Sequence, residues 1–127
     1  MRALVIDDSR TMRRIVAGQL SNLGFETVEA ADGRAALDLL EAGTEVELAC
    51  IDWNMPVMNG LEFVGAVREN PAWRDVTLMM VTTESEQGQI VRALAAGAHE
   101  YLIKPFTPDA FREKLQLLGL VEYEEIA

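Results

Sequence analysis

The feature that most constrains the fold of this chain is a fivefold alternation between two hydrophobic periods. Each of five short runs rich in β-forming residues is followed by a segment whose apolar residues recur at helical spacing. The predicted strands cover residues 3–6, 25–30, 46–51, 76–81 and 101–103. The predicted helices end at Gly24, begin after Asp32 and end at Gly43, span 60–70 and 87–96, and begin at Pro108. This alternation predicts an α/β fold, a doubly wound (βα)5 three-layer sandwich with a parallel sheet between two layers of helices.

Length and charge narrow the class of protein further. The 127 residues suit a single domain over 1–127, without a linker, internal repeat or low-complexity stretch. The 11 basic and 21 acidic residues give a net charge of −10, which argues against nucleic acid and anionic membranes as direct partners. No apolar run approaches the roughly 20 residues of a membrane helix, and the start, MRALVIDDSR, lacks the pattern of a signal peptide. We therefore expect a cytoplasmic protein, with its single cysteine, Cys50, in no internal disulfide.

Polar residues stand at the carboxyl ends of four of the five predicted strands. Right-handed crossovers bring these ends to one edge of a parallel sheet, where ligands bind at the switch in strand order. Each residue alone has an ordinary explanation, such as a helix cap, a turn or a solvated charge. Their convergence favours a functional site, formed by Asp7, Asp8, Asp52, Thr82 and Lys104.

The charges at this edge indicate its chemistry. Three adjacent carboxylates repel one another unless they take up protons or bind a cation, and oxygen ligands with room for water suit Mg²⁺. Mg²⁺ would neutralise a phosphoryl oxygen and allow a carboxylate to attack phosphorus. Lys104 would supply a second positive charge and Thr82 a hydrogen bond. We interpret Asp52 as the nucleophile of an aspartyl phosphate site, with the backbone carbonyl of Asn54 as a further metal ligand.

Four stretches of the sequence resemble the receiver domains of response regulators in bacterial two-component systems, and in particular the single-domain chemotaxis regulators. The stretches are VIDDSRTMRRIV (5–16), IDWNMPVMNG (51–60), MMVTTE (79–84) and YLIKPF (101–106). The resemblance covers almost the whole chain. It implies a flavodoxin-like fold with sheet order 2-1-3-4-5 and a cis peptide bond between Lys104 and Pro105.

The resemblance also implies a role for each residue of the metal and phosphoryl site. Asp52 resembles the phosphoacceptor, and Lys104 resembles the lysine that faces the phosphoryl group. Asp8 resembles the direct Mg²⁺ ligand, whereas Asp7 resembles the acid that holds the metal partly through water. The backbone carbonyl of Asn54 resembles the remaining protein ligand.

Four positions resemble those that control the output and lifetime of the phosphorylated state. Thr82 resembles the switch hydroxyl, and Tyr101 resembles the aromatic residue whose ring turns inward in the active form. Asn54 and Glu84 match the positions that influence autodephosphorylation in this family. These four residues are therefore expected to tune the switch.

The implied function is that of a stand-alone signalling switch and not of an enzyme. The protein would accept a phosphoryl group from a histidine kinase and then bind an effector protein through the face of strands four and five and helices four and five. A flagellar motor switch is a candidate effector, which would place the protein in chemotaxis or motility. We expect a monomer without an output domain. A second role stays open, that of a phosphorelay intermediate or phosphate sink.

Two rival classes fit the sequence less well. A haloacid-dehalogenase-like phosphatase also forms an aspartyl phosphate but needs an acid two residues after the nucleophile, where this chain has Asn54. A flavodoxin needs a phosphate-binding loop rich in hydroxyls and glycine after the first strand, where Asp7 and Asp8 would repel a bare phosphate. Both comparisons favour the receiver domain.

Some positions depart from the sequence pattern of the chemotaxis regulators, and others are expected to have no role in the site. Ser9 replaces an aromatic residue, Thr83 replaces a smaller one, and the tail at 120–127 is acidic and unfamiliar. These departures leave the chemistry in place and the pathway open. Trp53 is expected to be a partly exposed neighbour of Asp52, and His99 a surface residue.

Overall fold

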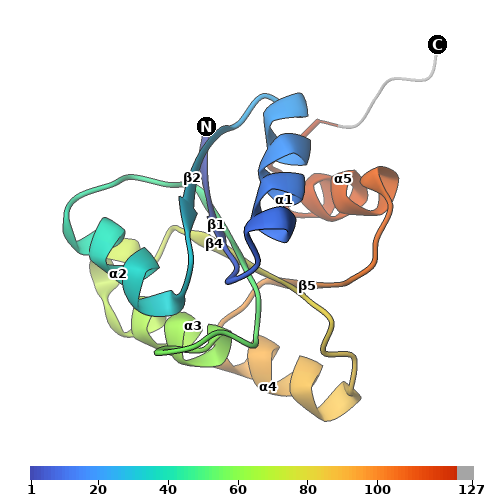
Figure 1. The fold of residues 1–127 in the computed structure, drawn as a ribbon. Coiled ribbons are helices and arrows are strands. Elements are labelled where there is room, and N and C mark those ends of the chain that lie inside the picture. Colours follow the sequence, from blue (N-terminus) through green and yellow to red (C-terminus); the bar gives the residue numbers. More distant parts are fainter. Residues whose placement is uncertain (123–127) are drawn as a thin grey trace.

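The computed structural model describes residues 1–122 and contains a parallel sheet of five strands (Figure 1). The sheet order β2-β1-β3-β4-β5 confirms the predicted order. The strands are β1 (Arg2–Ile6), β2 (Glu26–Ala30), β3 (Leu48–Ile51), β4 (Thr77–Thr82) and β5 (Glu100–Ile103). The helices are α1 (Arg10–Asn22), α2 (Gly33–Glu41), α3 (Gly60–Glu69), the 3₁₀ helix η1 (Pro71–Trp73), α4 (Gln87–Ala96) and α5 (Pro108–Leu117). Most of the acidic tail, residues 123–127, lies outside the described residues.

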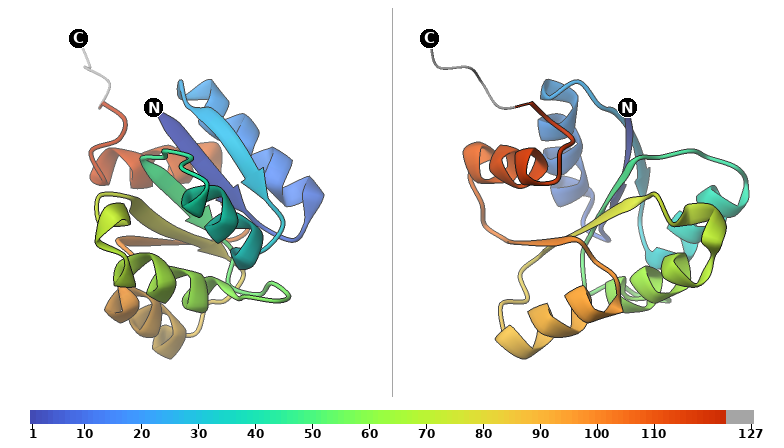
Figure 2. Two further views of the ribbon diagram at one scale, coloured as in Figure 1. Left: turned by 90° about the vertical axis from the view of Figure 1, so that its left-hand side faces the viewer. Right: turned by 180° about the vertical axis from the view of Figure 1, so that it is seen from behind.

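Two layers of helices cover the sheet. Helices α1 and α5 lie on one face, and α2, α3 and α4 lie on the other, as the two turned views show (Figure 2). Alternate residues of β1 enter opposite cores, with Ala3 and Val5 facing α1 and α5 while Leu4 and Ile6 face the other helices. Because the central strands are buried on both faces, they give the residues at their ends a rigid support.

Most predicted elements are confirmed, with boundaries that move by a few residues. Strand β3 begins at Leu48 and not at 46, and β5 begins one residue earlier than predicted, at Glu100. Strand β4 extends to Thr82, so the residue expected just beyond the strand is its last member. The sequence pattern missed η1, in which Asn70 accepts a hydrogen bond from the Ala72 amide and Pro71 occupies the first turn.

Side-chain caps start α1 and α2 within four residues of the preceding strand, and another cap starts α3 after a longer loop. Ser9 caps α1 by accepting from the amide of Met12 at 3.2 Å, and Asp32 caps α2 in the same way. Asn59 and Glu62 form a reciprocal capping box at the start of α3. Each cap satisfies amide groups that the helix leaves unpaired, and the preceding acids stay at the sheet edge.

The loop between β3 and α3 folds back onto Asp52 and Trp53, the two residues that follow β3. The Gly60 amide donates to the Trp53 carbonyl at 2.9 Å, and a Cβ atom at position 60 would collide with the carbonyl oxygen of Asp52. Glycine is therefore required at this close approach. In the same loop, Val57 takes a φ of 69°, a left-handed conformation that is unfavourable for a β-branched residue. The Lys104–Pro105 bond is cis, as predicted.

Candidate functional site

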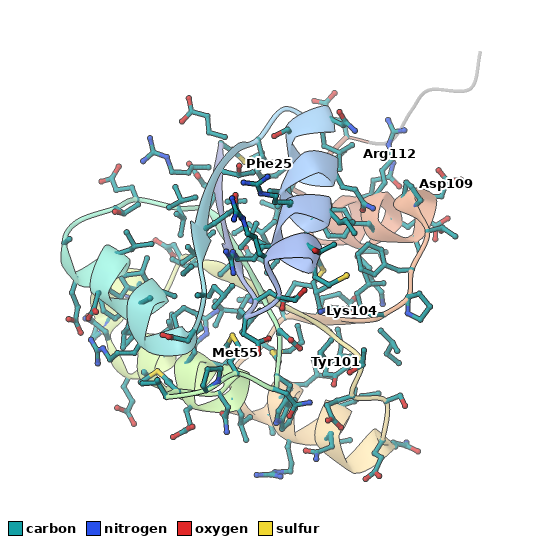
Figure 3. All side chains as sticks on the ribbon, in the orientation of Figure 1. Phe25, Met55, Tyr101, Lys104, Asp109 and Arg112 are labelled. Carbon is teal, nitrogen blue, oxygen red and sulfur yellow. The ribbon has the colours of Figure 1, made fainter. Side chains whose placement is uncertain are left out.

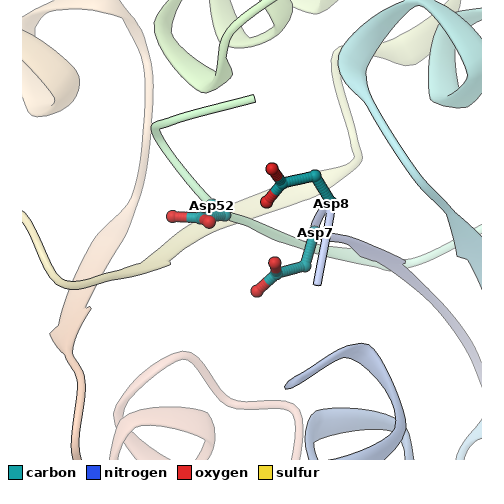
Figure 4. Close-up of side chains that lie close together, drawn as sticks. All are labelled: Asp7, Asp8 and Asp52. Carbon is teal, nitrogen blue, oxygen red and sulfur yellow. The ribbon is translucent and has the colours of Figure 1, made fainter. Parts of the chain in front are cut away.

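Three carboxylates meet at the carboxyl edge of the sheet. Asp7 and Asp8 follow β1, and Asp52 follows β3, the neighbouring strand (Figure 4). One oxygen from each side chain lies within 4.8 Å of the other two. Asp7 is buried and Asp8 is exposed, while the Asp52 side chain keeps 12% of its surface exposed. The acidic cluster is therefore buried at Asp7 and open to solvent at Asp8.

A buried lysine faces two of the acids from the other side of the site. Lys104 follows β5, and its side chain is only 9% exposed. Its Nζ donates to Asp7 Oδ2 at 2.7 Å and lies 3.7 Å from Asp52 Oδ2. The Lys104 amide donates to the Thr82 carbonyl at 2.9 Å, which holds the backbone of Lys104 against the end of β4. The Lys104 ammonium group is thus shared between the carboxylates of Asp7 and Asp52, which still repel each other.

The electrostatics of Asp52 reflect this crowded setting. Burial is the largest effect and raises the pKa of Asp52 above its ordinary value. A hydrogen bond from Thr82 and the charge of Lys104 lower the pKa, whereas the neighbouring Asp7 raises it again. A cation bound between the acids would favour the ionised form of Asp52, the form in which a carboxylate is nucleophilic.

The donor set fits a small, hard cation. Among residues 1–122, Asp7, Asp8 and Asp52 form the one cluster of three or more acidic, histidine or cysteine side chains close enough to share a metal ion. Carboxylate oxygens at this spacing can contact one cation after small movements or through water, and exposed Asp8 leaves room for that water. The site can therefore bind a metal ion.

A second group of residues links the site to β5. Thr82 is fully buried, and its Oγ1 accepts from the Glu84 amide at 3.4 Å. Asn54 Nδ2 donates to Glu84 Oε1 at 2.6 Å, which brings the two predicted tuning residues together at the mouth of the site. The Tyr101 hydroxyl donates to the Glu84 carbonyl at 2.7 Å. Glu84 is the junction of this network.

The ring of Tyr101 points inward. It is 6% exposed and belongs to the core between the sheet and helices α2 to α4. Tyr101 is the second residue of β5, whereas Lys104 follows the last residue of the strand, and Figure 3 labels both side chains. Burial raises the pKa of Tyr101, so its hydroxyl stays protonated and remains a donor to Glu84. The inward orientation, which the resemblance implies for the active form, is the one present here.

The structure brings together every side chain that the sequence assigned to the metal and phosphoryl site, and it also adds a residue. Arg13 donates to the Asp7 carbonyl at 2.8 Å, a contact that no sequence pattern had indicated. The prediction for Trp53 was wrong. This residue is buried, because its side chain joins the core between the sheet and helices α2 to α4 and the Arg92 guanidinium lies over its ring, 6.0 Å from the centroid. His99 is exposed, as predicted.

Together, the strand order and a carboxylate cluster facing a buried lysine define the class of α/β receiver domains. The family described as Response regulator receiver domain matches residues 3–116, and the chain belongs to this family of signalling switches.

Curated relatives support the same assignment. Chemotaxis protein CheY1 of Helicobacter pylori is 44% identical over 119 residues, which cover 93% of this chain and 96% of the relative. A chemotaxis protein CheY homolog of Campylobacter jejuni is 47% identical over 117 residues, covering 91% of this chain and 90% of the relative. The solved structure of chemotaxis protein CheY4 of Vibrio cholerae has a TM-score of 0.84 at 37% identity, over 91% of this chain and 96% of that chain. None of the helices in the described part of the chain is long and apolar enough to cross a membrane.

Proposed function

We propose that this protein is a phosphorylation-activated switch in which Asp52 accepts a phosphoryl group from a histidine kinase. The observation that carries the proposal is the position of the Lys104 ammonium, 2.7 Å from Asp7 and 3.7 Å from Asp52, beside the three-acid cluster. This arrangement suits phosphoryl transfer to the Asp52 carboxylate, because the Lys104 ammonium lies close to the position that the phosphoryl oxygens would take.

The proposed metal is Mg²⁺, held by Asp7, Asp8, Asp52 and the backbone carbonyl of Asn54. When bound, it would neutralise charge on the phosphoryl oxygens. The carboxylate of Asp52 attacks phosphorus, the bond between phosphorus and the histidine nitrogen of the donor breaks, and the electron pair stays on that nitrogen. Lys104 then stabilises the charge on the transferred group.

Readout of the phosphoryl group would pass through Thr82. A phosphoryl oxygen bonded to the Thr82 hydroxyl would compete with the Glu84 amide, which now donates to that hydroxyl at 3.4 Å. The Glu84 carbonyl also accepts from the Tyr101 hydroxyl, so a movement at Thr82 would pass to the Tyr101 ring and change how firmly its inward orientation is held. In Thr82→Ala, Asp52 should still be labelled, but phosphorylation should no longer raise the affinity for an effector.

The proposed effector surface is the face of β4 and β5 with α4 and α5. Large apolar side chains are exposed there on α4 and β5, at Val91, Leu94 and Ile103. Exposed apolar side chains of this kind suit protein binding. Because relatives at 44% and 47% identity are chemotaxis proteins, we propose a chemotaxis or motility effector such as a flagellar motor switch. A phosphorelay intermediate or phosphate sink remains the alternative role.

The remaining parts of the proposal concern the protein as a whole. The receiver-domain family matches residues 3–116 of the chain, and we propose that the protein works as a cytoplasmic monomer. It is a switch and not an enzyme, apart from its own phosphotransfer and autodephosphorylation, in which Asn54 and Glu84 set the rate. Its net charge of −10 supports protein partners over nucleic acid or anionic membranes.

Labelling with a small phosphodonor tests the proposal. With acetyl phosphate and Mg²⁺, intact-mass analysis should show one added phosphoryl group that hydroxylamine removes, and chelation of the metal should prevent labelling. Asp52→Asn should not be labelled, whereas the matched control Asp75→Asn, an exposed acid at the other edge of the sheet, should behave like the wild type. Equal labelling of Asp52→Asn would refute the assignment.

Effector binding tests the rest of the switch. Beryllofluoride, a phosphoryl mimic, should raise the affinity of the wild type for a flagellar motor switch protein by roughly 5- to 150-fold. Val91→Glu should lose that binding and keep labelling at Asp52. A labelled protein without any such affinity gain would favour the role of phosphate sink.

A further inference from the structure

Arg13 is a largely buried arginine next to the acidic site. It lies in the first turn of α1, where its amide donates to the carbonyl of Ser9, the residue that caps the helix. Its side chain is only 16% exposed, although arginine is normally a surface residue. Burial on this scale requires partners for the guanidinium group, and the structure provides two of them.

The first partner of Arg13 is the backbone carbonyl of Asp7. Arg13 Nη1 donates to this oxygen at 2.8 Å. Pairing of β1 with both neighbouring strands extends to Ile6, so the Asp7 carbonyl lies just past the paired part of the strand. A charged donor therefore replaces the sheet bond that a carbonyl within the strand would make.

This carbonyl controls the direction of the next residue. The Asp7 carbonyl and the Asp8 amide belong to one planar peptide unit. The Asp7 side chain is already fixed, since Oδ1 accepts from the Ser9 amide at 2.9 Å and Oδ2 accepts from Lys104. Arg13 fixes the peptide plane itself, and the plane determines where the exposed carboxylate of Asp8 leaves the chain.

The second partner of Arg13 is Glu29 on β2. Arg13 Nε lies 3.3 Å from Glu29 Oε1. Glu29 is opposite Val5 in the parallel register, so it stands on the neighbouring strand beside the end of β1. The planar guanidinium can bridge the two partners because its donors diverge in a fixed fork, which a lysine ammonium cannot reproduce.

We infer that Arg13, oriented by Glu29, is a positioning residue that presets Asp7 and Asp8 for the divalent cation of the phosphorylation site. The inference rests on the proposed function, because it assumes that these acids bind Mg²⁺. Partners that orient metal ligands in this way typically affect metal affinity about 10- to 100-fold. A surface ion pair between Arg13 and Glu29 with no such role would affect stability slightly and metal affinity not at all.

The test compares two neighbouring arginines on the same helix. Arg13→Met and Arg14→Met remove the same charge, but Arg14 is exposed. Calorimetric titration of the unphosphorylated proteins with Mg²⁺ should show affinity about tenfold weaker in Arg13→Met. Arg14→Met should change it by less than about twofold, the size expected for a screened surface charge. At saturating Mg²⁺, the labelling rate of Arg13→Met should return to within about threefold of the wild type, because nucleophile and lysine are intact.

Two further variants keep the test decisive if Arg13→Met folds poorly. Arg13→Lys retains the charge but not the fork, and Glu29→Gln retains the arginine but weakens its orientation. Each should weaken Mg²⁺ binding by about two- to fivefold, since one of the two linked contacts survives. Wild-type affinity in both of these variants, or in a folded Arg13→Met, would overturn the inference. Absence of Mg²⁺ binding in the wild type would instead refute the proposed function.

Discussion

Two basic side chains, Lys104 and Arg68, lie at opposite edges of the sheet and have opposite kinds of partner. Lys104 stands at the carboxyl edge, 2.7 Å from one carboxylate oxygen and 3.7 Å from another. Arg68 stands at the amino edge and donates to three neutral carbonyl groups at 2.7 to 3.1 Å, those of Gly97, Arg74 and Val76. At each edge, therefore, one basic side chain holds several chain segments together.

The difference between the edges separates a functional cation from a structural one. Arg68 joins the end of α4 to the segment that precedes β4, and its acceptors are backbone carbonyls, which carry no net charge. Lys104 is shared between two acids, and burial still raises the pKa of Asp52 above its ordinary value although the charge of Lys104 lowers it. The carboxyl edge thus keeps an electrostatic reason to bind a cation and a phosphoryl group, whereas the amino edge is complete.

The largest expected effect is on chemistry at the carboxyl edge. Lys104→Met should lower the rate at which acetyl phosphate labels Asp52 by about 10²- to 10³-fold, because a preorganised positive charge at the phosphoryl group is lost. Intact-mass time courses at saturating Mg²⁺ would measure it. The control Lys114→Met removes a lysine that pairs with Glu100 on the face of α5, and it should label normally. A rate within about tenfold of the wild type would show that Lys104 is no more functional than Arg68.

The next effect is on stability at the amino edge. Arg68→Met should lower the free energy of unfolding by about 3 kcal/mol, since three carbonyl groups lose a charged donor. Urea denaturation would measure this loss, and labelling of Asp52 by acetyl phosphate should stay within about twofold of the wild type. Arg74→Met is the control, because Arg74 contributes its backbone carbonyl and not its side chain to this network. A large loss of labelling in folded Arg68→Met would contradict the assignment of a purely structural role to Arg68.

The third effect tests whether the acids at the carboxyl edge destabilise the protein in the absence of metal. Burial raises the pKa of Asp52 in the folded state, so the folded protein binds more protons than the unfolded chain as pH rises past the ordinary value of 3.8. Its free energy of unfolding therefore falls through that window, and the penalty persists at neutral pH. Asp52→Asn removes the penalty and should therefore raise the free energy of unfolding in the presence of a chelator.

Addition of Mg²⁺ provides the complementary measurement. The wild type should gain stability with Mg²⁺ concentration, because the ion binds the folded state, and Asp52→Asn should gain less. Asp75→Asn, which changes an exposed acid at the amino edge, should respond to Mg²⁺ like the wild type. If Asp52→Asn were less stable than the wild type without metal, burial of the charged Asp52 side chain would not destabilise the folded protein.

The sequence predicted the carboxyl edge better than the amino edge for a physical reason. Parallel strands bring their ends together whatever the details of packing, so the positions of Asp52 and Lys104 followed from the order of the elements. The contacts of Arg68 and Arg13 are made by long side chains that reach across several segments, and no local pattern encodes them. Trp53 was misjudged for the same reason, since the fold of its loop and the position of Arg92 decide its burial.

The smallest expected effect is a dependence of the amino edge on pH. His99 Nδ1 accepts from the Leu78 amide at 3.1 Å and lies 3.3 Å from Arg68 Nη2. A proton on Nδ1 would remove the acceptor and place a positive charge beside the guanidinium. Burial, followed by the charge of Arg68, lowers the pKa of His99 below its ordinary value of 6.5. The amino edge should therefore lose stability when this ring is protonated.

Because the unfolded chain binds the proton on His99 more tightly, the stabilisation is fully present above about pH 6.5 and is lost as pH falls through the lowered pKa. The loss should stay below about 1 kcal/mol, since the ring is partly exposed to solvent. His99 is the only histidine in the chain, so the difference between the wild type and His99→Gln isolates its contribution. Urea unfolding of both proteins in chelator at about pH 5.5 and about pH 7.5 should show a steeper loss in the wild type. Equal losses would mean that the contact with Arg68 does not respond to pH and that the amino edge is purely structural.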